Sequence, residues 1–472
     1  MAGASPARRQ YGWLAAVLAV TLPLVFDLCE GMWRTPYPIS ETVALLQLYS
    51  EAPLGSLFDP TVRSWYRPLY HLSWWTLWHG TGSLDAALFG FKVFEITAVL
   101  ALVGLFVWHL RPRTFIDAAA ATFALAVLVG TPGFRANLEI PLLMTLVGMA
   151  LAMLVWILLE REHRWWHPPV IVALMLIAVG FKEQGLVIVP LVVAAWWTGA
   201  PGATRTTTAL VVAGAVAYLA MRVATSGNWA PFEQDVGLGF DYLSAAEASK
   251  RFGAFPLWIY GYNGTSTVAN VLFSEPTDGQ FGVVWHALHW QLEAWEFNHV
   301  MSSTLLTVLV AWWGLRTLKR EAGRPWSVES RALVAAVVAL AASGALGFNY
   351  SRDRLGGMAV VFYAIAAYFS VRAAAAWAAT GARMRMVGAC AGLVILAGAW
   401  QLRAIGTVED VRLRSVKIRR EWIVDLQQQR TDDTRERTYQ EILQAMAPQG
   451  LDPSAARPTP YPRWFRAWLG KL

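Results

Sequence analysis

Charged residues are scarce in this chain. Only 15% of its 472 residues are Asp, Glu, Lys or Arg, whereas 56% are hydrophobic and the mean hydropathy is +0.40. A soluble domain is nearer to about 25% charged, so this composition excludes an ordinary soluble protein. Apolar runs of about 17–25 residues recur along the chain, the length that crosses a bilayer as a helix. The runs are continuous rather than alternating, which excludes a transmembrane barrel.

Cysteine and the motifs of nucleotide chemistry are nearly or wholly missing. Cys29 and Cys390 are the two cysteines, and the topology predicted below places them in opposite leaflets, too far apart for a disulfide. The sequence has no Walker motif, GxSxG elbow, HExxH motif or dinucleotide fingerprint, which leaves cytosolic nucleotide chemistry without a site. The net charge of +7 lies mainly in residues 403–472, and we expect no nucleic-acid partner.

The apolar runs predict an all-α polytopic membrane protein with about eleven transmembrane helices. The predicted spans are 11–28, 86–109, 114–131, 140–159, 168–181, 184–198, 206–224, 299–317, 332–348, 357–377 and 386–403. The first is interpreted as an uncleaved span, because no clean small-residue cleavage site follows it. The chain then divides into a transmembrane domain, 1–403, and a basic, helical C-terminal tail, 404–472.

Basic residues in the short loops predict the orientation. Lys and Arg fall in alternate loops, which the positive-inside rule assigns to the cytoplasm. These residues are Arg8, Arg9, Arg111, Arg113, Arg161, Arg164, Arg205, Arg316, Lys319, Arg320, Arg324, Arg383 and Arg385. The loops on the outer face are then 29–85, 132–139, 181–183, 225–298 and 349–356. The long, polar, aromatic-rich loops therefore share one face, and we expect the protein to work there.

The segment SWYRPLYHLSW, residues 64–74, opens an aromatic stretch at 67–83 that is too short to span comfortably. It predicts a helix lying in the outer membrane interface. Pro68 would set the first turn, where proline is tolerated. Trp65, Trp74 and Trp75 would then seat the helix at the level of the lipid headgroups.

Acidic residues near the outer end of the first span are candidates for a general base. Asp27 and Glu30 lie in FDLCEG, and Glu41 follows in an amphipathic segment of the same loop. Partial desolvation raises the pKa of a carboxyl group and suits proton abstraction. The alternative interpretation is an ordinary hydrated helix end.

Two further polar segments interrupt apolar runs on the predicted outer face. Lys182 and Glu183 lie in FKEQG, whose plainest interpretation is a tight hairpin with its charges in water. Arg352 and Arg354 flank Asp353 in NYSRDRLGG. Two arginines at a membrane surface can hold a phosphate bidentately, and a solvated loop with an internal ion pair is the equal alternative.

The segment WHALHWQLEAWEFNH, residues 285–299, predicts one helix with a polar stripe. His286, His289, Glu293, Glu296 and His299 recur along one side at helical spacing. Such residues are plausible ligands for a divalent metal. The favoured alternative is the polar face of an interfacial helix whose tryptophans lie in lipid.

Three segments, in order along the chain, resemble the GT-C superfamily of membrane glycosyltransferases. The pattern is most similar to the protein O-mannosyltransferase-like branch, which includes the tetratricopeptide-containing O-mannosyltransferases. EAPLGSLFDPTVRSWYRPLYHLSW resembles the end of that family's first outer loop, FKEQGLVIVPLV its Lys-Glu-Gln-Gly helix start, and NYSRDRLGGMAVVFYAIAAYF its Glu-Arg-Tyr segment. The resemblance covers about residues 11–377. It departs from the family because Asp27 and Glu30 are not adjacent, Lys92 and Glu95 replace a His-and-Asn pattern, and no tetratricopeptide domain is present.

The resemblance implies an integral membrane enzyme, and the composition, rich in Ala, Arg and Trp, indicates a bacterial inner-membrane protein. It would transfer a sugar from a polyprenyl-phosphate donor to a hydroxyl of a glycan, lipid or protein on the outer face. The implied catalytic residue is Asp27, with Glu30 and Glu41 as alternatives. The implied donor-binding residues are Arg352 with Arg354, and secondarily Arg67, Lys182 and Glu183; Arg67 would face the lipid phosphate or the carboxylates at 27–30. No cofactor besides the lipid-linked donor is implied.

Two other functions are kept open. One is a transporter or flippase of lipid-linked saccharides, and the other is a catalytically inactive GT-C-like scaffold of the cell envelope. A transporter usually carries charges at mid-membrane and shows repeat symmetry. The charges here are predicted mainly at the outer rim, which favours the enzyme.

Overall fold

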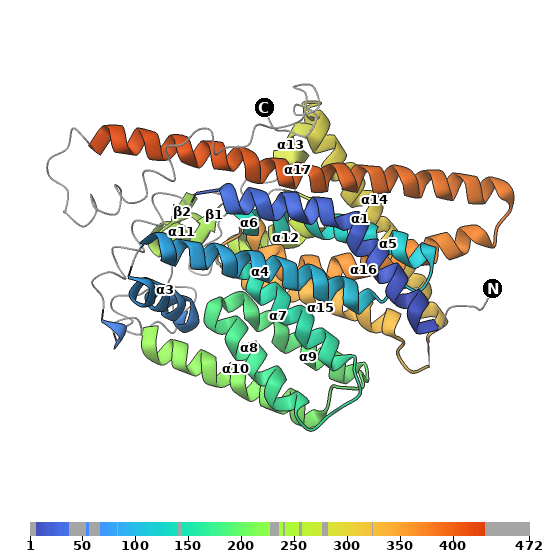
Figure 1. The fold of residues 1–472 in the computed structure, drawn as a ribbon, viewed down its shortest axis with the longest axis horizontal. Coiled ribbons are helices and arrows are strands. Elements are labelled where there is room, and N and C mark those ends of the chain that lie inside the picture. The colour runs from blue at the N-terminus through green and yellow to red at the C-terminus, as the bar shows by residue number, and fades with distance from the viewer. Residues whose placement is uncertain are drawn as a thin grey trace.

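The computed structural model describes residues 6–36, 53–55, 67–82, 84–139, 144–226, 236–238, 241–253, 257–275, 282–322 and 324–429. Nearly all of these residues are helical, and one short β-hairpin lies beside the helices at one end of the bundle (Figure 1). The predicted all-α class is therefore confirmed. The hairpin joins β1 and β2 with Val236 opposite Leu243.

The elements in chain order are α1 (Pro6–Arg34), α3 (Pro68–Thr81), α4 (Leu84–Leu110), α5 (Phe115–Gly130), α6 (Pro132–Glu139), α7 (Thr145–Leu159), α8 (His167–Phe181), η3 (Glu183–Val187), α9 (Ile188–Trp197), α10 (Arg205–Ser226), β1 (Val236–Leu238), β2 (Asp241–Leu243), α11 (Ala245–Phe252), α12 (Leu257–Phe273), α13 (Gly282–Leu288), α14 (Ala294–Arg320), α15 (Val328–Leu346), η4 (Asp353–Gly356), α16 (Gly357–Ala379) and α17 (Arg383–Gln429).

Each predicted span coincides with a helix, but the number of spans is lower than predicted by length. Among the described residues, 6 helices are long and apolar enough to cross a membrane, or 7 if α5 and α6 form one span bent by 59°. The helices α7, α8 and η3 with α9 are apolar but only 10–17 residues long. The count of about eleven is therefore not confirmed, whereas several membrane-length apolar helices are.

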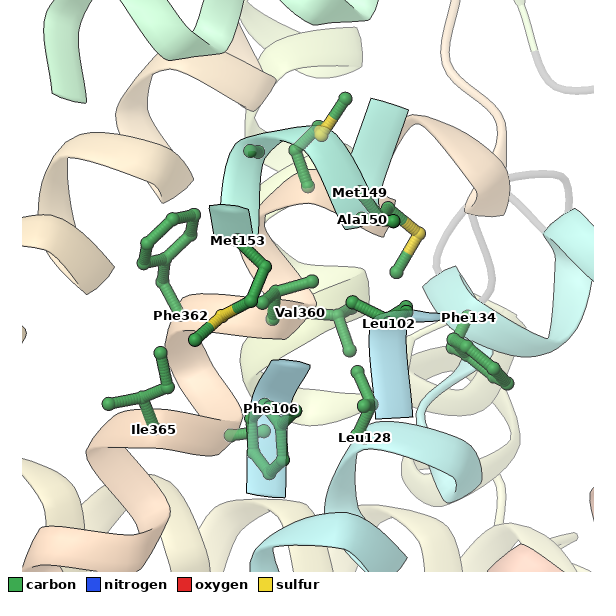
Figure 2. Packing of buried hydrophobic residues seen from close by; sticks show 14 of the residues in the cluster. Leu102, Phe106, Leu128, Phe134, Met149, Ala150, Met153, Val360, Phe362 and Ile365 are labelled. Carbon is green, nitrogen blue, oxygen red and sulfur yellow. The ribbon is translucent and has the colours of Figure 1, made fainter. Parts of the chain in front are cut away.

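The core is formed by helices that are apolar on every side. On α5, α7 and α16 most side chains are buried, as expected of helices enclosed by other helices. In Figure 2, Phe106 of α4, Leu128 of α5, Met153 of α7 and Val360 of α16 lie in one apolar cluster. Small residues permit close approach elsewhere: a Cβ added to Gly264 of α12 would lie 3.0 Å from the Gly344 carbonyl oxygen of α15.

The helix expected at 67–83 is present as α3, which begins at Pro68. Its tryptophans are placed differently from the prediction. Trp74 is fully buried and stacks on Phe91 of α4, with ring centroids 3.8 Å apart. Trp65 lies outside the described residues. Trp74 is therefore held by protein packing and does not contact headgroups, whereas Trp75 is half-buried and its contact with headgroups stays a prediction.

The segment expected to form one helix at 285–299 forms two. Helix α13 ends at Leu288, and α14 begins at Ala294 with Glu293 as its N-cap. Between them Trp290 has a left-handed backbone with φ of 58°, which interrupts any helix. His286 and Glu296 consequently lie on different helices, and the predicted single stripe is wrong.

Helix α12 and the second half of helix α17 lie outside the predicted spans. Helix α12 lies inside the predicted outer loop 225–298, and its polar residues Asn263, Ser266 and Asn270 are buried against neighbouring elements. Helix α17 continues without a break from its apolar first half through residue 404 to Gln429. Its second half packs along α1, where Ser415 donates to the Arg34 carbonyl oxygen.

Candidate functional site at one end of the bundle

The loops separate into the two predicted sets. Loops predicted on the outer face contact one another at one end of the bundle, which we name the site end; there Arg67 pairs with Glu183. Loops predicted on the cytoplasmic face meet at the other end, which we name the opposite end; there Arg331 pairs with Glu160. The polar segments singled out in the sequence therefore share one end of the molecule.

Arg67 forms a bidentate ion pair with Glu183. It is the residue before Pro68, and its Nε and Nη2 atoms lie 2.8 Å and 2.6 Å from the two carboxylate oxygens of Glu183. The two side chains are only 13% and 23% exposed. The carboxylate that meets Arg67 is therefore Glu183 and not one at 27–30, and the pair fixes α3 against the corner between α8 and η3.

The FKEQG corner is buried, which corrects the expectation of a hydrated hairpin. Lys182 is 4% exposed, and its Nζ donates to the Thr145 hydroxyl of α7 over 3.0 Å. A Cβ added to Gly185 would lie 2.5 Å from the backbone of Ala178 in α8. A glycine is needed here because η3 folds back directly onto the end of α8.

Amide side chains from three elements hold the NYSRDRLGG segment. Asn137 of α6 and Gln184 of η3 both donate to the Arg354 carbonyl oxygen, over 3.1 Å and 3.3 Å. Asn270 of α12 donates to the Asp353 carboxylate over 3.0 Å. The amide oxygens of all three holding residues are buried and accept no hydrogen bond from the described part of the chain. Such groups are uncommon in folded proteins; others lie elsewhere in the described residues, as at His167 Nδ1 and Trp313 Nε1, but three amide oxygens meet on this one segment.

The guanidinium groups of Arg352 and Arg354 both lie near the ring of Tyr350. The guanidinium carbons of Arg352 and Arg354 lie 5.2 Å and 5.6 Å from the ring centroid of Tyr350. Arg354 also donates to the Tyr350 hydroxyl, while Asp353 accepts from Asn270. Both arginines are partly exposed, so their positive charge lies near the surface of the site end.

The candidate bases have different environments. An Oδ1 atom of Asp27 lies 3.4 Å from Nη2 of Arg412, and the Asp27 side chain is 38% exposed while Arg412 is 5% exposed. Glu30 pairs with Arg34 of its own helix over 2.8 Å. Glu41 lies outside the described residues. Asp27 is thus a partly open carboxylate positioned by a buried arginine.

Helix α17 supplies site residues that the sequence interpretation assigned to a tail. Besides Arg412, Asp410 forms an ion pair with Arg135 of α6, with Oδ2 and Nη1 3.2 Å apart. Glu409 is fully buried, and neither of its carboxylate oxygens accepts a hydrogen bond from the described residues. The sequence signal was VEDVRLR, in which acids and arginines follow an apolar run with no proline between.

The carbonyl groups freed by the bend between α5 and α6 are satisfied by α17. Thr407 donates to the Val129 carbonyl oxygen over 2.9 Å, and Arg403 donates to that of Gly130 over 3.2 Å. Arg403 is 2% exposed, and its remaining bonds go to serine hydroxyls and a carbonyl. A guanidinium at a helix C-terminus is favoured by the helix dipole.

The predicted metal ligands on residues 285–299 do not come together in the described part of the chain. His286 pairs with Glu296 over 2.8 Å, but His289 instead contacts the Trp285 carbonyl oxygen. Among residues that the structure describes, no three His, Cys, Asp or Glu side chains gather closely enough to hold a metal ion. The break between α13 and α14 explains why the predicted ligands do not converge.

The site end therefore combines a partly open carboxylate, Asp27, with surface arginines on a rigid polar support. Such an arrangement can accept a proton and hold an anion. No protein-family model, curated protein or solved structure matches this chain. The functional argument consequently depends on the residues and their geometry.

Proposed function

We propose that this protein is a GT-C-type membrane glycosyltransferase that moves a sugar from a polyprenyl-phosphate donor to an acceptor hydroxyl on the outer, periplasmic face. The observation that carries the proposal is the contact between the three family-like segments. Arg67 of the first binds Glu183 of the second, 116 residues away, and Gln184 donates to the Arg354 carbonyl of the third, 170 residues away. Three segments that resemble the family thus contact one another through polar groups.

The proposed reaction assigns the proton to Asp27. The acceptor hydroxyl transfers its proton to the Asp27 carboxylate as its oxygen bonds to the anomeric carbon of the sugar. The bond between that carbon and the phosphate oxygen breaks, and its electron pair leaves with the polyprenyl phosphate. Arg412, 3.4 Å from Asp27, positions the carboxylate.

Arg352 and Arg354 are the proposed partners of the departing phosphate. Negative charge grows on that phosphate in the transition state, so fixed guanidinium groups stabilise it more than the ground state. Both arginines are held against Tyr350, and the three amide side chains fix the backbone between them. Arg67, Lys182 and Glu183 then support the site rather than contact the donor, which revises the roles that the resemblance implied.

The test is transfer by purified protein in proteoliposomes that contain labelled polyprenyl-phosphate sugars, with release of polyprenyl phosphate as the readout. We expect Asp27→Asn to lower the rate by about 100-fold or more, the usual effect of losing a general base. Asp117→Asn is the matched control, because Asp117 is also a helical carboxylate paired with arginine, Arg372, at the opposite end. Unchanged activity in Asp27→Asn, Glu30→Gln and Glu41→Gln alike would defeat the mechanism.

A transporter or flippase of lipid-linked saccharides is the second function, and the 59° bend between α5 and α6 favours it. Broken spans of transporters bind ions or substrates with their freed backbone groups. Here Arg403 and Thr407 occupy those carbonyls, which favours the enzyme. In the same proteoliposomes without acceptor, movement of intact donor across the bilayer would support the flippase. An absence of both transfer and movement would support the inactive scaffold.

A further inference from the structure

The segment between α12 and α14 exposes large apolar side chains. We name residues 282–293 the α13 hairpin: helix α13 followed by the turn that leads to Glu293. Trp285, Leu288 and Trp290 of this hairpin are 60%, 72% and 96% exposed. In Figure 1, α13 lies beyond α17 at the margin of the molecule. Exposed apolar clusters of this kind mark contact with lipid or with another protein.

The hairpin is held firmly from its inner side. The Glu275 carboxylate accepts from the Val283 backbone N–H over 3.1 Å, and His286 pairs with Glu296 over 2.8 Å. Glu275 and Glu296 are 3% and 4% exposed. The exposed tryptophans therefore belong to an ordered element whose polar contacts point toward the protein.

The left-handed turn is part of the same arrangement. Trp290 has φ of 58°, and the Gln291 N–H donates to the His286 carbonyl oxygen over 2.8 Å. A bulky residue in this backbone region is uncommon and costs conformational energy. The fold thus keeps a tryptophan with an uncommon backbone conformation at a highly exposed position.

The exposed apolar surface continues along α14. Phe297, Met301, Leu305 and Val308 follow one another at helical spacing, and each is at least 42% exposed. The opposite side of α14 buries polar residues such as Ser302 and Ser303. With 27 residues, the helix is about 40 Å long, a length that crosses a bilayer, although it is less apolar than the six candidate spans. A helix with apolar residues outside and polar residues inside is suited to a lipid surrounding.

We infer that the α13 hairpin lies in the bilayer, with Trp285, Leu288 and Trp290 at the boundary between headgroups and acyl chains. Residues 282–292, GVVWHALHWQL, contain no Asp, Glu, Lys or Arg. The one charged residue of the hairpin is its last, Glu293. A protein-docking surface is normally surrounded by a polar rim, whereas tryptophans with few charged neighbours are typical of the membrane interface. Continuity with the apolar side of α14 makes lipid the occupant.

This position brings the bilayer close to the site end. Asn270 donates both to the Glu275 carbonyl oxygen at the base of the hairpin and to the Asp353 carboxylate, each over 3.0 Å. One amide group therefore links the lipid-contacting element to the segment that carries Arg352 and Arg354. The inference itself is independent of the transfer reaction, since it concerns only where the hairpin lies.

Spin labels on single cysteines test the inference. In a Cys29→Ser/Cys390→Ser background, Trp290→Cys and Leu288→Cys are labelled and the protein is reconstituted in phosphatidylcholine vesicles. Power-saturation measurements compare collisions with oxygen, which concentrates in lipid, and with a water-soluble nickel chelate. We expect oxygen collisions to exceed nickel collisions at both positions, as at the lipid control Val308→Cys. The aqueous control Lys250→Cys, on exposed α11, should show the reverse.

Two results would overturn the inference. Greater collision with the nickel chelate at positions 288 and 290 would place the hairpin in water. Low collision with both reagents would show that a second copy of the chain, or another protein, covers it. Use of two labelled positions keeps the test decisive if the Trp290→Cys protein does not fold.

Discussion

The two ends of the bundle contain the same interaction in different settings. Each has a bidentate arginine–glutamate pair: Arg67 with Glu183 at the site end, and Arg331 with Glu160 at the opposite end. Arg331 also donates to the Trp326 carbonyl oxygen. The pair at the opposite end is the less exposed, at 10% and 9% against 13% and 23%.

The difference lies in what surrounds each pair. At the opposite end the Glu321 carboxylate accepts hydrogen bonds from Ser327, Ser330 and Arg320. At the site end the amide oxygens of Asn137 and Gln184 accept none from the described residues, although the opposite end also has buried atoms without a partner, His167 Nδ1 and Arg385 Nε. Proteins tolerate such unsatisfied groups where function requires them. We therefore interpret the opposite end as built for stability, and the site end as one in which some stability is given up.

Removal of one arginine from either pair should have the largest effect on stability. We expect Arg67→Met and Arg331→Met each to lower the free energy of unfolding by about 3–5 kcal/mol, because a buried carboxylate loses its partner. The loss should be larger for Arg331→Met, whose pair is less exposed. Unfolding in detergent, followed by tryptophan fluorescence, measures both.

The comparison is sharpened by the double variants Arg67→Met/Glu183→Leu and Arg331→Met/Glu160→Leu. Both should recover much of the lost stability, since replacement of a buried pair by apolar residues is often nearly neutral. Only the first should stay defective in sugar transfer. Equal transfer by both double variants would show that the site end has no special role.

Added methyl groups at two tightly packed glycines should have the next largest effect. A Cβ at Gly185 of the site end would lie 2.5 Å from backbone atoms of α8, and one at Gly202 of the opposite end 2.3 Å from the Leu158 carbonyl oxygen. We expect Gly185→Ala and Gly202→Ala each to destabilise by about 1–3 kcal/mol or more. Thermal unfolding checks the stability change. Transfer normalised to folded protein should fall for Gly185→Ala alone; a similar fall for Gly202→Ala would contradict this.

Replacement of Gln184 should change the free energy of unfolding only slightly. Gln184→Met removes a donor to the Arg354 carbonyl, which keeps its bond from Asn137, and also removes a buried, unsatisfied oxygen. These effects oppose each other, so we expect stability to change by less than about 1 kcal/mol. Ser330→Ala at the opposite end, which removes a bond to the Glu321 carboxylate, should lower stability by about 1–3 kcal/mol. A greater loss in Gln184→Met than in Ser330→Ala would reverse our interpretation of the two ends.

Patterns of neighbouring residues in the sequence predicted most of the helices and which loops lie at the same end of the bundle. Apolar runs located a helix at every predicted span, and Pro68 marked the start of α3. The alternation of predicted spans gave the two sets of loops that meet at each end, whereas the side of the membrane, predicted from the basic loops, stays a prediction. These features depend on residues close together in the chain.

The pairings at the site end could not be predicted in the same way. The partner of Arg67 is 116 residues away, and the partner of Asp27 lies on α17, in a segment interpreted as a tail. Neither pairing leaves a local pattern. The hidden helix α12 was missed because its buried polar residues, such as Asn263 and Asn270, lower the hydropathy on which span prediction depends.

A pH dependence confined to the opposite end should be the smallest effect. Burial alone would raise the pKa of Glu321, but hydrogen bonds from Ser327, Ser330 and Arg320 lower it to about 2. A carboxyl group with a lowered pKa in the folded state stabilises the protein above its ordinary pKa of 4.5 and loses that contribution as pH falls toward 2.

The stability difference between the wild type and Glu321→Gln should therefore stay constant from neutral pH down to the ordinary pKa, then shrink. Ser330→Ala should move the loss to higher pH, because one of the hydrogen bonds that lowers the pKa is gone. Melting temperatures of the three proteins across this pH range measure both effects, and a difference that persists unchanged to the lowest pH would show that these hydrogen bonds do not stabilise the opposite end.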